Sequence, residues 1–153
     1  MKILFICHGN ICRSPMAEFV MKDLVQQKGI EARYEIASAA TTDEEIWGNR
    51  GNPIYPSARE VLQKHGISVK GKYAILITKE DYDYYDYMIV MERLNLREIK
   101  SILPKDPDHK IHLLLEYTGE NKDIDDPWYS GDFDLAYQEI ERGCKALLEY
   151  LEK

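Results

Sequence analysis

The sequence predicts a single α/β domain over residues 1–153, built on an open parallel sheet of about four strands with helices on both faces. Short apolar runs of strand length alternate along the chain with segments of helical periodicity. Strands separated by helical segments pair in parallel through right-handed crossovers. The chain length of 153 residues suits one domain of common size.

The first half of the chain begins with an apolar strand at 2–7, followed by a turn-rich segment and a helix. Pro15 suits the first turn of that helix, and Ser14 before it is expected to cap the exposed amides. Gly29 is expected to end the helix. The next expected elements are a second strand at 34–38, a long polar surface loop at 39–56 and a helix at 57–65.

The second half opens with an acidic and aromatic stretch at 75–85, to which the pattern assigns no definite structure. From Phe133 onward, apolar residues recur at steps of three and four, which predicts a closing amphipathic helix. The elements expected between these two segments are a strand at 87–91, a helix at 94–103 ended by Pro104, and a strand at 111–115.

The composition, with 44% apolar and 31% charged residues, is that of an ordinary soluble globular protein. The first apolar run is too short for a signal-peptide core, and no run is long enough to cross a membrane. Three cysteines, an odd number, then indicate reduced thiols in the cytoplasm rather than a disulfide framework.

The formal net charge of −7 repels nucleic acid and anionic membrane surfaces at long range. Neither is therefore an expected partner. A compact anion such as a single phosphate can still bind, because backbone amides and one arginine act over a few ångströms, where local geometry outweighs global charge.

The segment CHGNICRS at 7–14 places Cys7 and Arg13 with five residues between them, after the first strand and at the start of the first helix. A loop at a helix amino terminus directs unpaired backbone amides at one point, and the helix dipole adds positive potential there. We expect an oxyanion cradle lined by the residues of this loop, namely His8, Gly9, Asn10, Ile11, Cys12 and Ser14.

Cys7 is the expected nucleophile of this cradle, because the same positive field stabilises a thiolate. The planar fork of Arg13 can hold two phosphate oxygens at once and meet the charge that develops as a phosphoryl group transfers. Gly9 permits a close approach of the backbone to the anion, and the Asn10 side chain can brace the loop by local hydrogen bonds.

A Cys-x5-Arg match is a short pattern that also arises by chance. The alternative is a buried cysteine that ends a strand, followed by an unrelated arginine. The context favours a functional site, because a strand precedes the loop, a helix with Ser-Pro at its start follows it, and no Gly-Lys-Ser/Thr of a nucleotide-binding loop is present.

The segment ILFICHGNICRSPMAE at 3–18 resembles the start of low-molecular-weight protein tyrosine phosphatases. The resemblance implies a four-stranded parallel sheet of flavodoxin-like order 2-1-3-4 and hydrolysis of protein phosphotyrosine in two steps through a phosphocysteine. It implies no metal or other cofactor. The same resemblance resumes along nearly the whole chain, at SA (38–39), KHGI (64–67), ITKED (77–81) and DPWY (126–129).

Asp126 matches the family's aspartate before proline, and the resemblance implies that it protonates the leaving phenol and then acts as base for water. An acid is useful here because the phenol of tyrosine has a pKa of about 10. From the residues alone, Asp125-Asp126-Pro127 is more typical of a solvated acidic turn. Asp125 is chemically equivalent and adjacent, so only the position before Pro127 singles out Asp126.

The resemblance also implies that Trp128 and Tyr129 wall the pocket and sandwich the substrate ring, with Trp47 on the opposite side. Stacking suits a phenyl phosphate. Tall aromatic walls would let phosphotyrosine reach the thiolate and exclude the shorter phosphoserine. Two aromatic side chains half-buried in a loop are the structural alternative.

Three further residues, Glu18, Ser38 and His65, match family positions that are buried and hydrogen-bonded behind the loop together with Ser14. Cys12 matches a cysteine that traps the oxidised nucleophile as a reversible disulfide, which protects against overoxidation. Packing as a small apolar residue under the loop is compatible with that role.

Two other functions remain open from the sequence. A thiol-coupled arsenate reductase shares this fold and cradle but needs further redox cysteines; none lies between Gly66 and Asp126, and Cys144 belongs to the apolar stripe of the last helix. A non-catalytic anion-binding or redox-sensing module would interconvert Cys7 and Cys12 without a proton donor. The sequence favours the phosphatase, a monomer or weakly self-associating protein acting on a tyrosine-phosphorylated protein.

Overall fold

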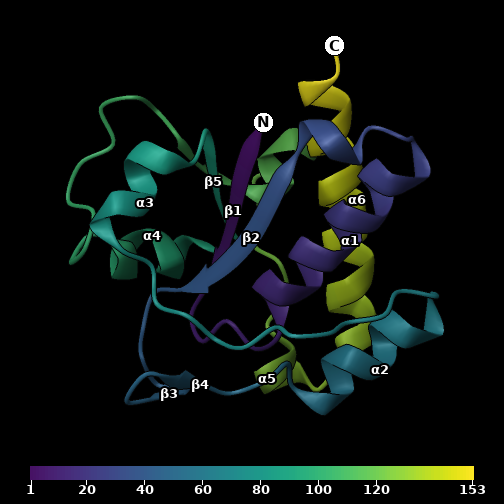
Figure 1. The fold of residues 1–153 in the computed structure, drawn as a ribbon, viewed down its shortest axis with the longest axis horizontal. Helices are drawn as coiled ribbons and strands as arrows, with labels where there is room; N and C mark the ends of the chain where they lie inside the picture. The colour runs from purple at the N-terminus through teal and green to yellow at the C-terminus, as the bar shows by residue number, and fades with distance from the viewer.

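A parallel sheet of four strands runs through the centre of the computed structural model, which describes all residues 1–153 (Figure 1). The order β2-β1-β5-β6 is 2-1-3-4 when only these strands are counted, so the predicted fold class and strand order are confirmed. The strands are β1 (Lys2–Cys7), β2 (Glu35–Ala40), β5 (Tyr87–Val90) and β6 (Ile111–Leu113).

Helices cover both faces of the sheet. One face carries α1 (Arg13–Gln27), α2 (Pro56–Lys64) and α6 (Phe133–Leu151), and the other carries α3 (Lys79–Tyr84) and α4 (Arg93–Ile99) (Figure 1). None of these helices is both long enough and apolar enough to cross a bilayer.

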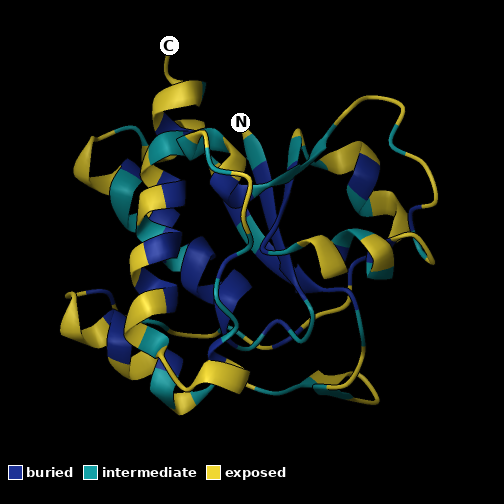
Figure 2. Ribbon diagram, turned by 180° about the vertical axis from the view of Figure 1, so that it is seen from behind, coloured by how far each residue is buried: buried dark blue, intermediate teal, exposed yellow.

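Alternate residues of β1 face opposite sides of the sheet and so enter different cores. Ile3 and Phe5 belong to a cluster of 24 buried residues with α1, α2 and α6, whereas Leu4 and Ile6 belong to a cluster of nine on the side of α3 and α4. Figure 2 shows β1 and β5 mostly buried and the outer helix faces exposed. Burial on both faces explains why β1 reads as an unbroken apolar run.

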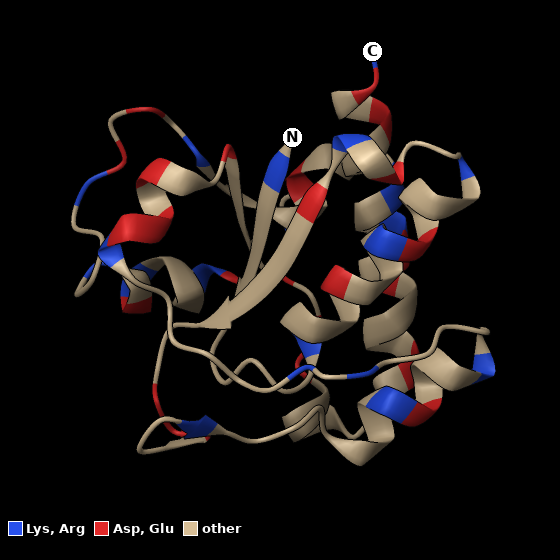
Figure 3. Ribbon diagram, in the orientation of Figure 1, with Lys and Arg blue, Asp and Glu red and all other residues tan.

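Charged residues lie mostly on the helices and loops, where acidic and basic side chains are mixed, and the strands carry few of them (Figure 3). This distribution follows from the burial of the sheet on both faces, because an ion without a partner is costly to bury.

Two expectations for the first half were wrong. Ser14 does not cap α1, because the N-cap residue is Cys12 and the Ser14 hydroxyl instead lies 3.0 Å from the sulfur of Cys7. The loop at 39–56 contains a small antiparallel hairpin of β3 (Ile46–Trp47) and β4 (Arg50–Gly51). Two-residue strands are too short to produce a periodic pattern, so the sequence did not reveal them.

Boundaries in the second half also differ from the expectation. The stretch at 75–85 contains α3; α4 ends at Ile99, and turns follow it before Pro104. The expected strand at 111–115 stops at Leu113 and continues as the 3₁₀ helix η2 (Leu114–Thr118). The short elements η1 (Glu31–Arg33) and α5 (Pro127–Ser130) were not expected, and the closing helix from Phe133 is confirmed as α6.

Candidate active site

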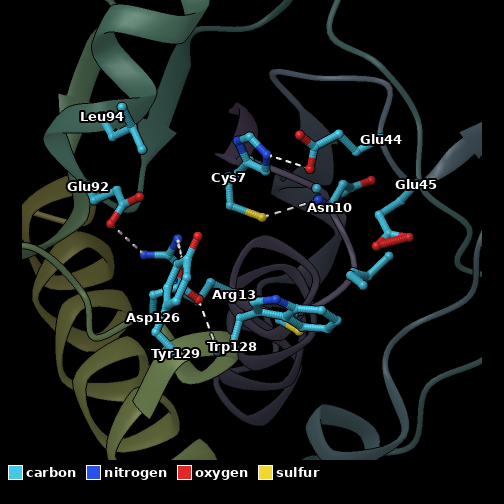
Figure 4. A pocket seen from close by; sticks show the side chains of 14 residues that line it. Cys7, Asn10, Arg13, Glu44, Glu45, Glu92, Leu94, Asp126, Trp128 and Tyr129 are labelled. Atoms are coloured by element: carbon cyan, nitrogen blue, oxygen red, sulfur yellow. Dashed lines mark hydrogen bonds and ion pairs between the residues drawn. The ribbon is translucent and has the colours of Figure 1, made fainter. Parts of the chain in front are cut away.

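A pocket of about 350 Å³ lies where β1 gives way to α1, beyond the carboxyl ends of the central strands. Figure 4 shows its side chains converging from several loops. The lining residues are Cys7, His8, Gly9, Asn10, Ile11, Cys12, Arg13, Glu44, Glu45, Glu92, Leu94, Asp126, Trp128 and Tyr129.

The loop from Cys7 to Arg13 owes its shape to Asn10, whose φ of 59° lies in the left-handed region that asparagine tolerates better than most residues. The buried Asn10 amide group donates hydrogen bonds to the hydroxyls of Ser14 at 2.8 Å and Ser38 at 2.9 Å. Its carbonyl oxygen accepts from the backbone N–H of Ile75 at 3.1 Å. Asn10 therefore ties the loop to α1, β2 and the segment that follows α2.

Cys7 is the last residue of β1, and its side chain lines the floor of the pocket although the residue is only 4% exposed. The backbone N–H of Asn10 donates to the Cys7 sulfur at 3.3 Å, as Figure 4 shows. The hydroxyl of Ser14 lies 3.0 Å from the same sulfur. Two polar hydrogens can therefore be directed at a thiolate in this position.

Arg13 is the first residue of α1 and is 3% exposed, with its guanidinium facing the pocket. Nη1 donates to the backbone oxygen of Ile124 at 3.0 Å and lies 3.2 Å from Glu92, and Nη2 lies 3.3 Å from Asp126. Burial lowers the pKa of Arg13, but the neighbouring Cys7, Glu92 and Asp126 outweigh it and raise the pKa above the ordinary value of an arginine. Arg13 is therefore a permanent cation aimed at the pocket.

A buried polar layer supports the loop from behind. The hydroxyl of Ser38 donates to Glu18 at 2.6 Å, and Glu18 also binds Lys22 at 2.6 Å. Lys72 donates to the backbone oxygen of Ser38 at 2.7 Å and lies 3.7 Å from Glu18; burial lowers the pKa of Lys72. These contacts place Glu18 and Ser38 where the sequence expected them.

His65 does not belong to this layer, so that expectation was wrong. The residue is exposed at the end of α2, and its ring stacks on Tyr137 with centroids 4.0 Å apart. The position behind the loop is taken by Lys72, which the sequence analysis did not single out. No local pattern marks a lysine whose partners lie 34 and 54 residues away in the sequence.

The structure distinguishes Asp126 from its neighbour Asp125. Asp126 is the N-cap of α5, accepts from the backbone N–H of Trp128 at 3.1 Å and lines the pocket beside Arg13. The Asp125 carboxylate instead accepts from the hydroxyl of Ser130 at 2.5 Å and does not line the pocket. Only one of the two carboxylates therefore faces the cradle.

The pocket rim is aromatic on one side and acidic on the other. Trp128 and Tyr129 are 58% and 87% exposed, and the ring of Trp128 makes an edge contact with Tyr55. Trp47 is 72% exposed and does not line the pocket, contrary to the expected opposite wall. Glu44 and Glu45, which precede β3, occupy that side, facing Glu92 and Leu94 across the pocket (Figure 4).

His8, the second residue of the loop, bridges two acidic side chains. Its Nδ1 lies 2.5 Å from Glu98 of α4 and its Nε2 lies 2.8 Å from Glu44. Burial lowers the pKa of His8, but the hydrogen bonds with Glu44 and Glu98 outweigh it and raise the pKa above 6.5. Thr41 donates to Glu98 at 2.9 Å and so fixes that carboxylate.

All three cysteines are free. Cys12 is 8% exposed and lines the pocket, and burial raises its pKa to about 12, so its thiol is protonated at neutral pH. Cys144 lies on the inner face of α6 and is completely buried in the core, as expected. The chain contains no group of three or more His, Cys, Asp or Glu side chains arranged to hold a metal ion.

A parallel α/β sheet whose first strand leads into a pocket lined by a cysteine and an arginine is typical of cysteine-dependent phosphatases. The family model for low molecular weight phosphotyrosine protein phosphatases matches residues 2–153. The chain belongs to this family, whose members hydrolyse phosphotyrosine through a phosphocysteine.

Individual relatives agree over nearly the full length. The low molecular weight protein-tyrosine-phosphatase YfkJ of Bacillus subtilis is 37% identical over 153 residues, covering 99% of this chain and 96% of the relative. The phosphatase of Gallus gallus is 41% identical, with coverages of 96% and 93%.

Solved structures agree as well. The crystal structure of YfkJ matches with a TM-score of 0.91 at 35% identity, covering 99% of this chain and 94% of that chain. The low molecular weight protein tyrosine phosphatase of Streptococcus pyogenes matches with a TM-score of 0.83 at 39% identity, covering 99% and 97%.

Proposed function

We propose that this phosphatase hydrolyses phosphotyrosine with Cys7 as nucleophile, Arg13 as phosphate clamp and Asp126 as general acid and base. The observation that carries the assignment is that Asp126, from a distant part of the chain, lines the same pocket as Cys7 and Arg13 of the loop. The Cys7 sulfur accepts a hydrogen bond from the backbone N–H of Asn10, and Asp126 lies 3.3 Å from the Arg13 guanidinium.

In the first half-reaction the Cys7 thiolate attacks phosphorus, so that an S–P bond forms and the bond from phosphorus to the tyrosine oxygen breaks. Arg13 and the loop amides balance the charge on the equatorial oxygens. Asp126 gives its proton to the leaving phenolate, whose conjugate acid has a pKa of about 10.

In the second half-reaction the Asp126 carboxylate takes a proton from water, which attacks phosphorus and breaks the S–P bond. Inorganic phosphate leaves and Cys7 returns to the thiolate. Asp126 thereby recovers the proton that it gave away in the first step. The protons and electrons of the whole cycle balance without a redox partner or a metal.

Without substrate, the Arg13 guanidinium is held by Glu92, Asp126 and the backbone oxygen of Ile124. An incoming phosphate must compete with the contact to Asp126. When Asp126 is protonated it is neutral and no longer forms an ion pair with Arg13. The guanidinium is then available to the phosphate dianion at the stage when Asp126 carries the proton that it donates as acid. Glu92 stays paired with Nη1 and keeps the fork oriented.

The aromatic rim supports selection of aryl phosphates. Trp128 and Tyr129 follow Asp126 and Pro127 and line the same pocket, so that a ring carried by the leaving oxygen passes between the acid and these side chains. Stacking favours a planar ring there. The buried position of the Cys7 sulfur supports discrimination against the shorter phosphoserine. The remaining loop residues, His8, Gly9, Ile11, Cys12 and Ser14, complete the cradle.

Cys12 is the proposed partner of Cys7 under oxidation. Peroxide converts the Cys7 thiolate to a sulfenic acid, which condenses with the Cys12 thiol and releases water to form a disulfide. Both side chains line the same pocket, which supports this reaction. A dithiol reductant restores the two thiols.

We place this activity on a tyrosine-phosphorylated protein in the cytoplasm, with the enzyme acting as a monomer or with weak self-association and without nucleic acid, membrane or cofactor. The net charge of −7 and the free state of all cysteines support that setting. Cys144 is completely buried, which disfavours the outward disulfide relay of an arsenate reductase. The Asp126 carboxylate beside the cradle disfavours a purely redox-sensing module.

Turnover of p-nitrophenyl phosphate in the presence of a chelator tests the assignment. Cys7→Ser should abolish turnover, and Asp126→Asn should reduce kcat by about 10²–10⁴-fold because an acid–base group contributes that much. The matched control is Asp125→Asn, which should stay within a fewfold of the wild type since its carboxylate does not line the pocket. Equal losses in the two aspartate variants would contradict the assignment.

A further inference from the structure

The mechanism leaves one buried carboxylate without a role. Glu139 lies on α6 with its side chain only 4% exposed, on the same helix face as the core residues Ala136 and Ile140. A buried carboxylate is costly unless it is paired and hydrogen-bonded, and an apolar residue would pack at least as well there. Its contacts therefore indicate what it does.

Both carboxylate oxygens of Glu139 bind the segment that leads to Asp126. Oε1 accepts from the backbone N–H of Asp125 at 2.8 Å, and Oε2 pairs with Nζ of Lys122 at 2.6 Å. The first bond fixes the peptide one residue before the proposed acid. The second neutralises the buried charge, and Lys122 is itself about half exposed.

The rest of this segment is held from the opposite side. The backbone N–H of Ile124 donates to Met91 at the end of β5, the backbone oxygen of Ile124 accepts from Arg13, and Asp123 accepts from the backbone N–H of Arg93. These contacts tie residues 123–124 to β5, α4 and the cradle. Glu139 alone ties the Asp125 peptide to α6, so its loss removes the contact that fixes this peptide against the helix.

We propose that Glu139 is a positioning residue for the general acid, setting the place of the Asp126 carboxylate through the Asp125 peptide. The proposal rests on the proposed function, in which Asp126 protonates the leaving phenol. Proton transfer is sensitive to small displacements, because a misplacement of about 1 Å can cost about 10²-fold in rate. Phosphate binding at Cys7 and Arg13 does not pass through this contact.

The test compares two substrates whose leaving groups differ in their need for a proton. Glu139→Met keeps the volume and removes both acceptors; it should lower kcat/KM for phenyl phosphate by about tenfold, a fraction of the general-acid contribution. With 2,4-dinitrophenyl phosphate, whose leaving group is already a stable anion, kcat/KM should change less than twofold. Vanadate should inhibit the variant and the wild type equally.

Two further variants separate positioning from a merely structural role. Glu139→Gln retains an oxygen that accepts from the Asp125 N–H, so it should restore the wild-type ratio between the two substrates. Lys122→Met leaves that hydrogen bond in place while removing the ion pair, so it should lower the melting temperature without changing the ratio. Equal losses on both substrates in Glu139→Met, or an altered ratio in Lys122→Met, would overturn the proposal.

A double-mutant comparison distinguishes failure of this inference from failure of the proposed function. If Asp126→Asn shows no selective loss on phenyl phosphate, the acid assignment itself fails. If it shows that loss, adding Glu139→Met should cause no further selective loss, because both changes disable the same proton transfer. An additional loss that multiplies with the first would show that Glu139 acts elsewhere.

Discussion

Two basic side chains of the pocket, His8 and Arg13, are each held between a pair of acidic side chains. Arg13 is almost fully buried between Glu92 and Asp126, whereas the side chain of His8 is 37% exposed beside Glu44 and Glu98. Salt screens the contacts of the exposed His8 with its carboxylates strongly and those of the buried Arg13 weakly. These four carboxylates orient the two basic side chains that line the pocket.

His8 makes the stability of the protein depend on pH. Its pKa in the folded protein lies above the ordinary 6.5, chiefly because the hydrogen bonds with Glu44 and Glu98 outweigh burial. A raised pKa means that the stabilisation is fully present below pH 6.5 and is lost as the pH rises through the folded-state pKa. The difference in unfolding free energy between wild type and His8→Gln should therefore shrink as the pH rises.

Urea unfolding of both proteins across this range measures the difference directly. The control is His65→Gln, which removes an exposed histidine whose ring stacks on Tyr137. A difference between wild type and His8→Gln that stays constant with pH would contradict the assignment of the slope to His8.

Among the elements, the hairpin of β3 and β4 shows how a minor feature sets the acidic side of the pocket. Asn52, just after β4, donates through its backbone N–H to the Glu45 carbonyl at 2.9 Å and through its amide to the Glu45 carboxylate at 2.8 Å. Its own carbonyl accepts from the backbone N–H of Ala74 at 2.8 Å. The hairpin thus connects the pocket rim to the segment after α2.

Gly51 is essential to that connection, because a Cβ at this position would lie 1.9 Å from the carbonyl oxygen of Ala74. Since the clash involves backbone atoms, Gly51→Ala should destabilise the protein by about 1–3 kcal/mol, as overpacking does. It should also raise KM for aryl phosphates by displacing Glu45. Thermal unfolding and steady-state kinetics measure the two effects.

The matched control for the hairpin is Gly48→Asn at its turn. A Cβ there meets nothing within 4 Å, and asparagine tolerates the φ of 67°. This variant should remain close to the wild type in both measurements. Wild-type stability in Gly51→Ala would show that the segment at Ala74 moves freely, contrary to the structure.

For the molecule as a whole, β1 joins the two cores. Phe5 packs with α1, α2 and α6, and Leu4 packs on the opposite side with residues of α3 and α4. Both side chains are essentially inaccessible to solvent. The cradle begins at Cys7 on the same strand, so loss of either core removes the support of the site.

Truncating either side chain should therefore lower the stability of the whole protein. Phe5→Ala should cost about 3–5 kcal/mol and Leu4→Ala about 2–5 kcal/mol, from lost burial and the cavity left behind. In each variant, circular dichroism and phosphatase activity should be lost at the same urea concentration, as expected for one cooperative unit. Activity lost well before circular dichroism in Leu4→Ala would show that the smaller core unfolds separately.

Local signals in the sequence predict the fold class, the order of the main elements and the loop from Cys7 to Arg13 between the first strand and the first helix. The apolar run at 2–7, the glycine and asparagine of the loop and Pro15 lie within a few residues of one another. The family resemblance added the strand order and the proposal of Asp126 as the acid. The amphipathic spacing after Phe133 likewise predicted α6 with its correct start.

The tertiary structure alone decided which distant side chains meet at the site. Lys72 rather than His65 lies behind the loop, Glu44 and Glu45 rather than Trp47 face the pocket, and Glu139 reaches the Asp125 peptide from α6. These contacts join residues far apart in the chain. No periodic or spacing pattern records them, because a long-range contact depends on how whole elements pack rather than on the residues beside it.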